Sequence, residues 1–283
     1  MNKHEYSKII HDTHKAVSSS YGDLDIHGQI AKNNLSHWNY TRNVEQPISH
    51  IVNHYLPWKS FSMLDAGCGN GQLFHLYTSI GAKVIYGIDF GIQMLLEACH
   101  RADINRIRFF PINGKLENLP FANDSFQLIN LYGVLEHLPE PIKVLRELER
   151  IIVPGGILIV SVPRKGSLAW LTYGLFCPSL HSVVMKETFF ERIKFSRKRK
   201  MKLYRFYSKA AVRNLICSLN QMTVLTRIPI AHGGLVGFPA VVLKYLSCQG
   251  KYDYIDNWNR FACHIKLIPA GEYIVFKKIT NKL

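Results

Sequence analysis

The sequence predicts an α/β protein built on a doubly wound, mostly parallel sheet of seven strands, into which a lid is inserted. Three observations lead to this prediction. Between residues 44 and 163, short apolar segments alternate with amphipathic segments of helical period, which is the pattern of parallel strands joined by crossover helices. The first apolar segment runs into a glycine-rich turn at residues 64–71. Two later strand-like segments, at 222–228 and 272–279, bring the number of strands to seven.

The expected helices share a spacing of three or four residues between apolar side chains. They cover residues 44–56, 72–82, 91–102, 140–152 and 208–220. Pro57 ends the first helix, Gly81 closes the second, and Ser208 is a suitable N-cap for the last. The buried face of the fourth helix is expected to consist of Ile142, Leu145, Leu148 and Ile152.

The expected strands are short and apolar, as strands covered on both faces of a sheet are. In chain order they lie within residues 62–71, 83–89, 106–112, 125–133, 155–162, 222–228 and 272–279. Pro154, Gly155 and Gly156 are expected to form a turn before the fifth strand, and the last strand is expected to alternate along its length. We expect residues 1–43 to form an N-terminal segment and residues 44–283 one domain. Inserts at about 163–207 and 229–270 interrupt it.

The composition is that of a globular protein, with 47% hydrophobic and 19% charged residues over 283 positions. The six cysteines lie far apart without a C-x-x-C pair, so we expect reduced thiols rather than disulfides or a zinc site. His50 and His54 have the spacing of metal ligands on a helix, but no nearby residue completes a set, and no metal is expected. The polar N-terminus lacks the apolar core of a secretory signal, and no apolar run reaches the ~20 residues that span a bilayer. We therefore expect a cytoplasmic protein.

The main functional signal is the glycine-rich turn after the first strand. Gly67, Gly69 and Gly71 permit positive φ and the close approach of a ligand, at the positive end of the following helix. Asp65 stands just before these glycines, and Asp89 ends the second strand, at the separation typical of an acid that binds ribose hydroxyls. Glycine turns also occur for purely structural reasons. The turn, the strand and the acid together favour a site for a ligand that contains a ribose.

At these residues the sequence resembles the class I methyltransferases that depend on S-adenosylmethionine (SAM). The match begins with LDAGCGNG, whereas dinucleotide-dependent enzymes typically show G-x-G-x-x-G. It covers about residues 44–163 and continues through the motifs LENLPFANDSFQLI, LYGVLEHLPEP and ELERIIVPGGILIVSVP. This succession is similar to the branch that includes ubiquinone and menaquinone methyltransferases. It implies a Rossmann-like fold, an enzyme, and SAM as the cofactor.

The resemblance also implies roles for single residues around the cofactor. Gly67, Gly69 and Gly71 would pass around the methionine end of SAM. Asp65 would orient the turn and the amino group, and Asp89 would chelate the ribose hydroxyls. Residues further along the chain would complete the pocket: Gly114 to Leu116 would lie beside adenine, and Leu131 and Tyr132 would line the space beyond the fourth strand.

Two positions depart from the family pattern. Lys115 stands where the family usually has an acid that accepts the adenine amino group, which leaves that contact to backbone groups, Glu117 or Asn113. Gln127 replaces a second acid, and we expect it to have a structural role.

The N-terminal segment 1–43 is predicted to act as a lid over the cofactor, as in similar methyltransferases. Arg42 would pair with the methionine carboxylate. Tyr21, Trp38 and Tyr40 either belong to this lid or form an aromatic patch packed on the outside of the sheet.

His137 is the candidate general base, because a hydroxyl or phenol acceptor benefits from a base near the end of the fourth strand. The alternative is that Glu136 and His137 cap the helix that follows Pro139, since the family shows this pair across many chemistries. Glu136 is expected to be solvated.

A dense basic tract follows the fifth strand. Residues 186–213 hold 11 Lys or Arg and 2 Asp or Glu, a net +9 out of +15 for the whole chain. This tract could clasp an apolar acceptor with a negative group, lie on an anionic membrane, grip RNA, or form a solvated face. The candidate acceptor-lid residues are Trp170, Tyr173, Arg197, Arg199 and Tyr204.

We interpret the chain as a SAM-dependent methyltransferase that acts on a small-molecule acceptor. O-methylation is favoured, and the acceptor could be lipid-like or anionic. This includes peripheral contact with an anionic membrane. The alternative is a tRNA or RNA methyltransferase that binds nucleic acid through the basic tract, although the Asn/Asp-Pro-Pro-aromatic signature of amino-group nucleic-acid enzymes is absent. A SAM-binding protein without catalysis is a third hypothesis.

Overall fold

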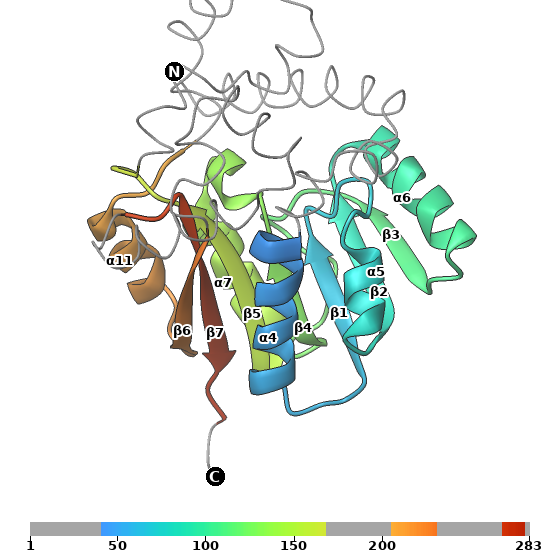
Figure 1. Cartoon of the computed structure of the whole chain (residues 1–283), viewed down its shortest axis with the longest axis horizontal. Helices are drawn as coiled ribbons and strands as arrows, with labels where there is room; N and C mark the ends of the chain where they lie inside the picture. The colour runs from blue at the N-terminus through green and yellow to red at the C-terminus, as the bar shows by residue number, and fades with distance from the viewer. Residues whose placement is uncertain (1–40, 168–204, 231–267, 281–283) are drawn as a thin grey trace, which may run out of the picture.

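Figure 1 shows a computed structural model of the chain, which describes residues 41–167, 205–230 and 268–280. The sheet has seven strands in the order β3-β2-β1-β4-β5-β7-β6. The first five strands pair in parallel, and β7 runs antiparallel between β5 and β6. The strands are β1 (Phe61–Ala66), β2 (Ala82–Asp89), β3 (Phe109–Asn113), β4 (Phe126–Leu131), β5 (Ile152–Pro163), β6 (Met222–Ile230) and β7 (Gly271–Lys278). The predicted α/β fold with a mostly parallel sheet of seven strands is confirmed, and the predicted lid lies outside the described residues.

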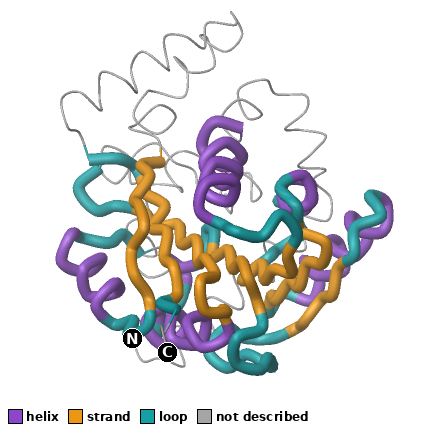
Figure 2. Tube along the Cα trace, turned by 90° about the horizontal axis from the view of Figure 1, so that it is seen from below, coloured by secondary structure: helices purple, strands orange, loops and turns teal. Residues whose placement is uncertain are grey.

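Helices cover both faces of this sheet (Figures 1 and 2). The longer ones are α4 (Gln46–Tyr55), α5 (Phe74–Ser79), α6 (Ile92–Ile104), α7 (Pro141–Ile151) and α11 (Lys209–Cys217), with short turns η1 (Thr41–Glu45) and η2 (Leu135–His137). α4, α5 and α6 share one hydrophobic cluster with the sheet, and α7 and α11 share the other. Ser208 caps α11 as predicted, accepting a hydrogen bond from the Ala211 N–H. Among these described helices, none is both long enough and apolar enough to cross a membrane.

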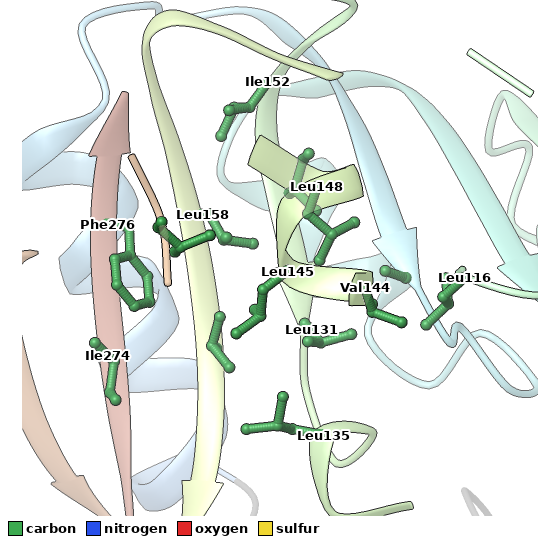
Figure 3. Close-up of a cluster of buried hydrophobic side chains, with 14 of the residues drawn as sticks. Leu116, Leu131, Leu135, Val144, Leu145, Leu148, Ile152, Leu158, Ile274 and Phe276 are labelled. Atoms are coloured by element: carbon green, nitrogen blue, oxygen red, sulfur yellow. The ribbon is translucent and has the colours of Figure 1, made fainter. Parts of the chain in front are cut away.

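The buried face of α7 differs from the predicted one. Ile142, in the first turn of the helix, is 38% exposed. Ile152 has already left the helix to begin β5. Figure 3 shows the face that packs on the sheet. Its apolar members are Val144, Leu145, Leu148 and Ile151.

The predicted turn before the fifth strand lies within β5 itself. Phe126 pairs with Ile152, but Leu128 pairs with Ile157, so the intervening residues of β5 form a bulge. Gly155 has φ +80° there, a conformation that side chains rarely adopt.

β7 differs from the predicted alternating strand, because it is buried on both faces between β5 and β6. Two of its three charged residues, Glu272 and Lys278, are buried with ionic partners. Glu272 pairs with Arg164 and Arg227, and Lys278 donates to Asp124. Local charge therefore gave a misleading signal of exposure here, because the partners come from distant parts of the chain.

Candidate functional site

The predicted site residues gather where the parallel strands end. The turn with the three glycines follows β1, Asp89 ends β2, and Leu131 ends β4. β1 lies between β2 and β4, so the chain leaves β1 toward one side of the sheet and later returns to build the other side. Ligands of open α/β sheets bind in the crevice at such a point of reversal.

The glycine turn has three residues with positive φ: +80° at Gly67, +51° at Gly69 and +74° at Gly71. A Cβ at Gly67 would lie 2.4 Å from the Val134 side chain, and one at Gly71 would lie 2.5 Å from the Phe74 ring. These two glycines are therefore required by the protein's own packing as well as by φ. A Cβ at Gly69 would meet, among the described residues, only the Met94 methyl group at 3.4 Å, which leaves room for a ligand to approach.

Asp89 fixes this turn from the neighbouring strand. Its Oδ2 accepts a hydrogen bond from the Gly69 N–H at 3.0 Å, and its Oδ1 accepts one from the Gly91 N–H at 2.8 Å. Burial raises the pKa of the Asp89 carboxyl above its usual range, against the lowering effect of these backbone donors. A carboxylate oxygen can accept more than one hydrogen bond, so Asp89 retains the capacity to bind ligand hydroxyls.

Asp65 lies beneath the turn and is 4% exposed. The Tyr77 hydroxyl donates to its Oδ1 at 2.9 Å, and the Asn130 amide donates to the Tyr77 oxygen at 2.7 Å. Burial raises the pKa of Asp65 to about 7, the nearby charge of Asp89 adds to the rise, and hydrogen bonds from Tyr77 and Asn130 oppose it.

The end of β4 carries the candidate acceptor side. Tyr132 is stacked on Tyr273, with ring centroids 6.1 Å apart. Burial, with a smaller effect of the Glu136 charge, raises the pKa of the Tyr132 phenol to about 12, so the phenol keeps its proton near neutral pH. Glu136 is buried, with 5% exposure, which corrects the expectation that it is solvated. His137 is half-buried at the end of η2, in a turn of its own that precedes the α7 N-cap, Glu140.

The predicted adenine side shows one buried and one exposed residue. Leu116 packs in the core cluster (Figure 3), whereas Lys115 is exposed. The Asn113 amide donates to the carbonyl groups of Asp89 and Phe90, and it thereby joins the ends of β2 and β3.

Gln127, the second departure from the family pattern, has a structural role as expected. Its side-chain oxygen accepts a hydrogen bond from the Ser62 N–H at 3.0 Å, which ties β4 to β1.

Several predicted residues fall outside what the structure describes. The N-terminal segment through residue 40 and the candidate acceptor-lid residues lie outside the described residues, and of Arg42 only the backbone is described. The candidate acceptor-lid residues are Trp170, Tyr173, Arg197, Arg199 and Tyr204.

Sequence reasoning missed two polar residues of the site, Tyr77 and Asn130. Both are fully buried. Asn130 gave a weak signal, because it is a polar residue among the apolar residues 128–131 of the fourth strand, whereas Tyr77 gave none, because its neighbours His75, Thr78 and Ser79 are also polar. A polar group within an apolar strand needs a buried partner.

Comparisons with known proteins find similarity in the part of the chain that holds the site. Residues 64–160 match a family model described as a methyltransferase domain. The ubiquinone biosynthesis O-methyltransferase of Serratia proteamaculans is 31% identical over 111 residues, which cover 39% of this chain and 46% of that protein. The tRNA U34 carboxymethyltransferase of Vibrio cholerae is 31% identical over 147 residues, which cover 50% of this chain and 42% of that protein. The match thus spans less than half the length of either relative.

A solved structure shares the fold over most of the chain. Geranyl diphosphate C-methyltransferase from Streptomyces coelicolor, in complex with Mg²⁺, geranyl diphosphate and S-adenosyl-L-homocysteine (SAH), superposes with a TM-score of 0.52 at 13% identity. The superposition covers 84% of this chain and 80% of that one. At this identity the likeness shows the fold alone.

Proposed function

We propose that the protein methylates a small-molecule acceptor, with oxygen as the favoured acceptor atom. The premise is a class I SAM-dependent methyltransferase of the ubiquinone-like branch, which is supported by the match of residues 64–160 to a methyltransferase domain and by the similarity to a ubiquinone biosynthesis O-methyltransferase. The observation that carries the proposal is the link between Asp89 and Gly69. It joins the carboxylate that we assign to the ribose to a glycine turn in which a Cβ at Gly69 would meet, among the described residues, only the Met94 methyl group.

The described residues fit the cofactor. We assign the methionine end of SAM to the glycine turn, with its ammonium group toward Asp65. The ribose hydroxyls are assigned to Asp89, and adenine to the backbone around Leu116. Leu131 and Tyr132 are assigned to the wall of the pocket beyond β4. When bound, SAM supplies a methyl group on a sulfonium that is open to in-line displacement. The chain itself orients the two reactants, excludes water and accepts the acceptor's proton.

His137 is our candidate for the group that accepts this proton. It ends the turn that follows β4, close in sequence to the Tyr132 phenol and the buried Glu136 carboxyl. An imidazole titrates near neutral pH and can take a proton from a phenol or hydroxyl as the new bond to oxygen forms.

The favoured acceptor is apolar and carries a negative group. Such a compound suits a segment in which the apolar residues 168–176 precede the basic tract. The similarity to a ubiquinone biosynthesis enzyme supports this choice. With a lipid-like acceptor, we further propose peripheral contact with an anionic membrane, where each basic residue near the surface contributes about 1 kcal/mol.

A second candidate function is methylation of tRNA. Two observations favour it: the net charge of +9 over residues 186–213 and the similarity to a tRNA-modifying enzyme. Binding of this kind weakens steeply with salt, because each neutralised phosphate releases counterions.

One experiment separates the two candidates. In the test variant, Arg197, Lys198, Arg199 and Lys200 are replaced by Gln. In the control variant, the same replacement is made at four exposed basic residues near the amino ends of β1, β2 and β3: Lys59, Lys83, Arg106 and Arg108. Both proteins and the wild type are given methyl-labelled SAM with bulk tRNA, with soluble phenols and catechols, or with phenolic prenyl lipids in anionic vesicles, at two salt concentrations.

For a small-molecule enzyme, we expect label in a phenolic product and a raised KM in the test variant, while the control variant behaves like the wild type. The tRNA function would replace our proposal if the label appeared in tRNA, if tRNA binding weakened steeply with salt, and if only the test variant lost that binding. Binding of SAH without label in any acceptor class would favour a protein that binds SAM without catalysis.

A further inference from the structure

Three side chains from different elements meet beneath the glycine turn. Asp65 belongs to β1, Tyr77 to α5 and Asn130 to β4. They form a chain of hydrogen bonds in which the Asn130 amide donates to the Tyr77 oxygen, and the Tyr77 hydroxyl donates to Asp65. Tyr77 and Asn130 have no exposed surface, and Asp65 has 4%.

Packing alone does not account for this arrangement. A Phe would fill the volume of the Tyr77 ring, and an apolar residue would suit β4 at position 130, where the neighbours are Ile129 and Leu131. Burying three polar groups is unfavourable unless they satisfy one another. The Asn130 Oδ1 is also buried and has no hydrogen-bond partner among the described residues. A buried polar network whose burial is unfavourable, located at a ligand site, indicates a functional requirement.

The network also controls the direction of the Asp65 carboxyl. Asp65 pairs in register with Asn130 on one side and with Gly87 on the other, and it stands two residues before the first glycine of the turn. With Oδ1 held by Tyr77, rotation of the carboxyl is restricted.

We propose that Tyr77 and Asn130 are positioning residues, which hold Asp65 as an oriented carboxylate for the ammonium group of the cofactor's methionine moiety. The inference rests on the proposed function, since it assumes that SAM or SAH binds at the glycine turn. It adds that binding requires the ionised form of Asp65.

A measurable consequence follows from the protonation of Asp65. In the free protein its pKa is about 7, and a neighbouring ammonium group favours the ionised form. Binding below about pH 7 therefore releases a proton from Asp65 to the buffer. The groups that face Asp65 are Tyr77, Asn130, Asp89 and Cys68. Burial raises the pKa of the Cys68 thiol well above its usual range, so Cys68 adds no charge here.

The test measures SAH affinity and proton release by calorimetry between pH 6 and pH 8, in buffers of different ionisation enthalpy. In the wild type we expect affinity to rise about tenfold over this range, because the ionised fraction of a carboxyl with a pKa near 7 rises by that factor. Tyr77→Phe removes a hydrogen bond that lowers the pKa of Asp65. Its affinity should fall several-fold at pH 7. The part of this loss that comes from the higher pKa of Asp65 should shrink as the pH rises, whereas the part that comes from the lost orientation of the carboxylate should remain.

Two further variants identify the group responsible. Tyr86→Phe is the matched control, because the Tyr86 ring packs on Phe110, Phe121 and Phe126 away from Asp65, and it should leave affinity unchanged. In an Asp65→Asn background, proton release and the pH-dependent part of the Tyr77→Phe effect should both disappear.

The outcomes separate the inference from the proposed function. If the wild type binds no SAH at any pH, the proposed function fails. If it binds SAH with an affinity independent of pH, the ionised form of Asp65 is not required for binding. If Tyr77→Phe binds SAH as tightly as the wild type at every pH, the positioning role is wrong. In both cases the cofactor assignment stands.

Discussion

The carboxylate of Asp89 accepts a hydrogen bond from the backbone N–H of Gly69, which lies 20 positions earlier in the chain. The N–H groups of Gly67 and Cys68 donate to the Ile88 carbonyl, at 2.8 and 3.2 Å. The end of β2 thus shapes the turn that follows β1. The shape of the turn depends on contacts with a neighbouring strand as well as on its own glycines.

Two glycine substitutions separate backbone strain from steric conflict. Gly71 and Gly133 have similar φ values, +74° and +68°. A Cβ at Gly71 would lie 2.5 Å from Phe74, whereas one at Gly133 would meet nothing within 4 Å among the described residues. We expect Gly133→Ala to lower the free energy of unfolding by about 1–2 kcal/mol and Gly71→Ala by about 1–3 kcal/mol more. If denaturant unfolding gave the same loss of unfolding free energy for both variants, Phe74 would have moved aside to accommodate the new methyl group.

Because Glu272 pairs with the buried Arg164, we expect replacement of Glu272 to cause a large loss of stability. Glu272→Gln would leave the Arg164 charge, which is 5% exposed, without its carboxylate partner. We expect the free energy of unfolding to fall by about 3–5 kcal/mol. Glu97→Gln is the control, because it removes a partly exposed pair with Arg101 at 3.9 Å and should change stability by less than about 1 kcal/mol. If Glu272→Gln lowered the free energy of unfolding as little as Glu97→Gln does, a structural role for Glu272 would be contradicted.

Asp65 predicts a dependence of stability on pH. Its carboxyl has a pKa of about 7 in the folded chain, compared with an ordinary value of 3.8, so the folded chain retains a proton that the unfolded chain loses from about pH 4. The free energy of unfolding therefore falls as pH rises through this window, by at most about 4 kcal/mol. Asp65→Asn should remove this fall and raise Tm at pH 8 while weakening SAH binding. A lower Tm at pH 8 would mean that ionised Asp65 is stabilising.

The proposed role of His137 as general base predicts that its replacement changes kcat but not SAH affinity. If it accepts the acceptor's proton, His137→Ala should lower kcat for an oxygen acceptor by about 10²–10⁴-fold, because that is the range for general base catalysis, and should leave SAH affinity intact. The exposed His50 is the control position, and His50→Ala should have no effect. Unchanged kcat in His137→Ala would remove His137 from the mechanism.

Much of the fold could be predicted because the strands and helices of residues 44–163 are short, periodic and closed by Gly or Pro. The glycine turn and Asp89 could be predicted because their positions relative to the strands are local in sequence. Tyr77 and Asn130 could not, since their contact joins residues 53 positions apart. The burial of β7 was missed for the same reason: the partners of Glu272 and Lys278 lie far away along the chain.

The most direct test of the central claim is calorimetric titration of the wild-type protein, Asp89→Ala and the exposed control Asp103→Ala with SAH, and separately with NAD. We predict that SAH binds the wild type and Asp103→Ala alike and raises their Tm. Asp89→Ala should bind far more weakly, because it loses charge-assisted hydrogen bonds to the ribose. No binding of SAM or SAH to the wild type, or binding of NAD in their place, would contradict the account.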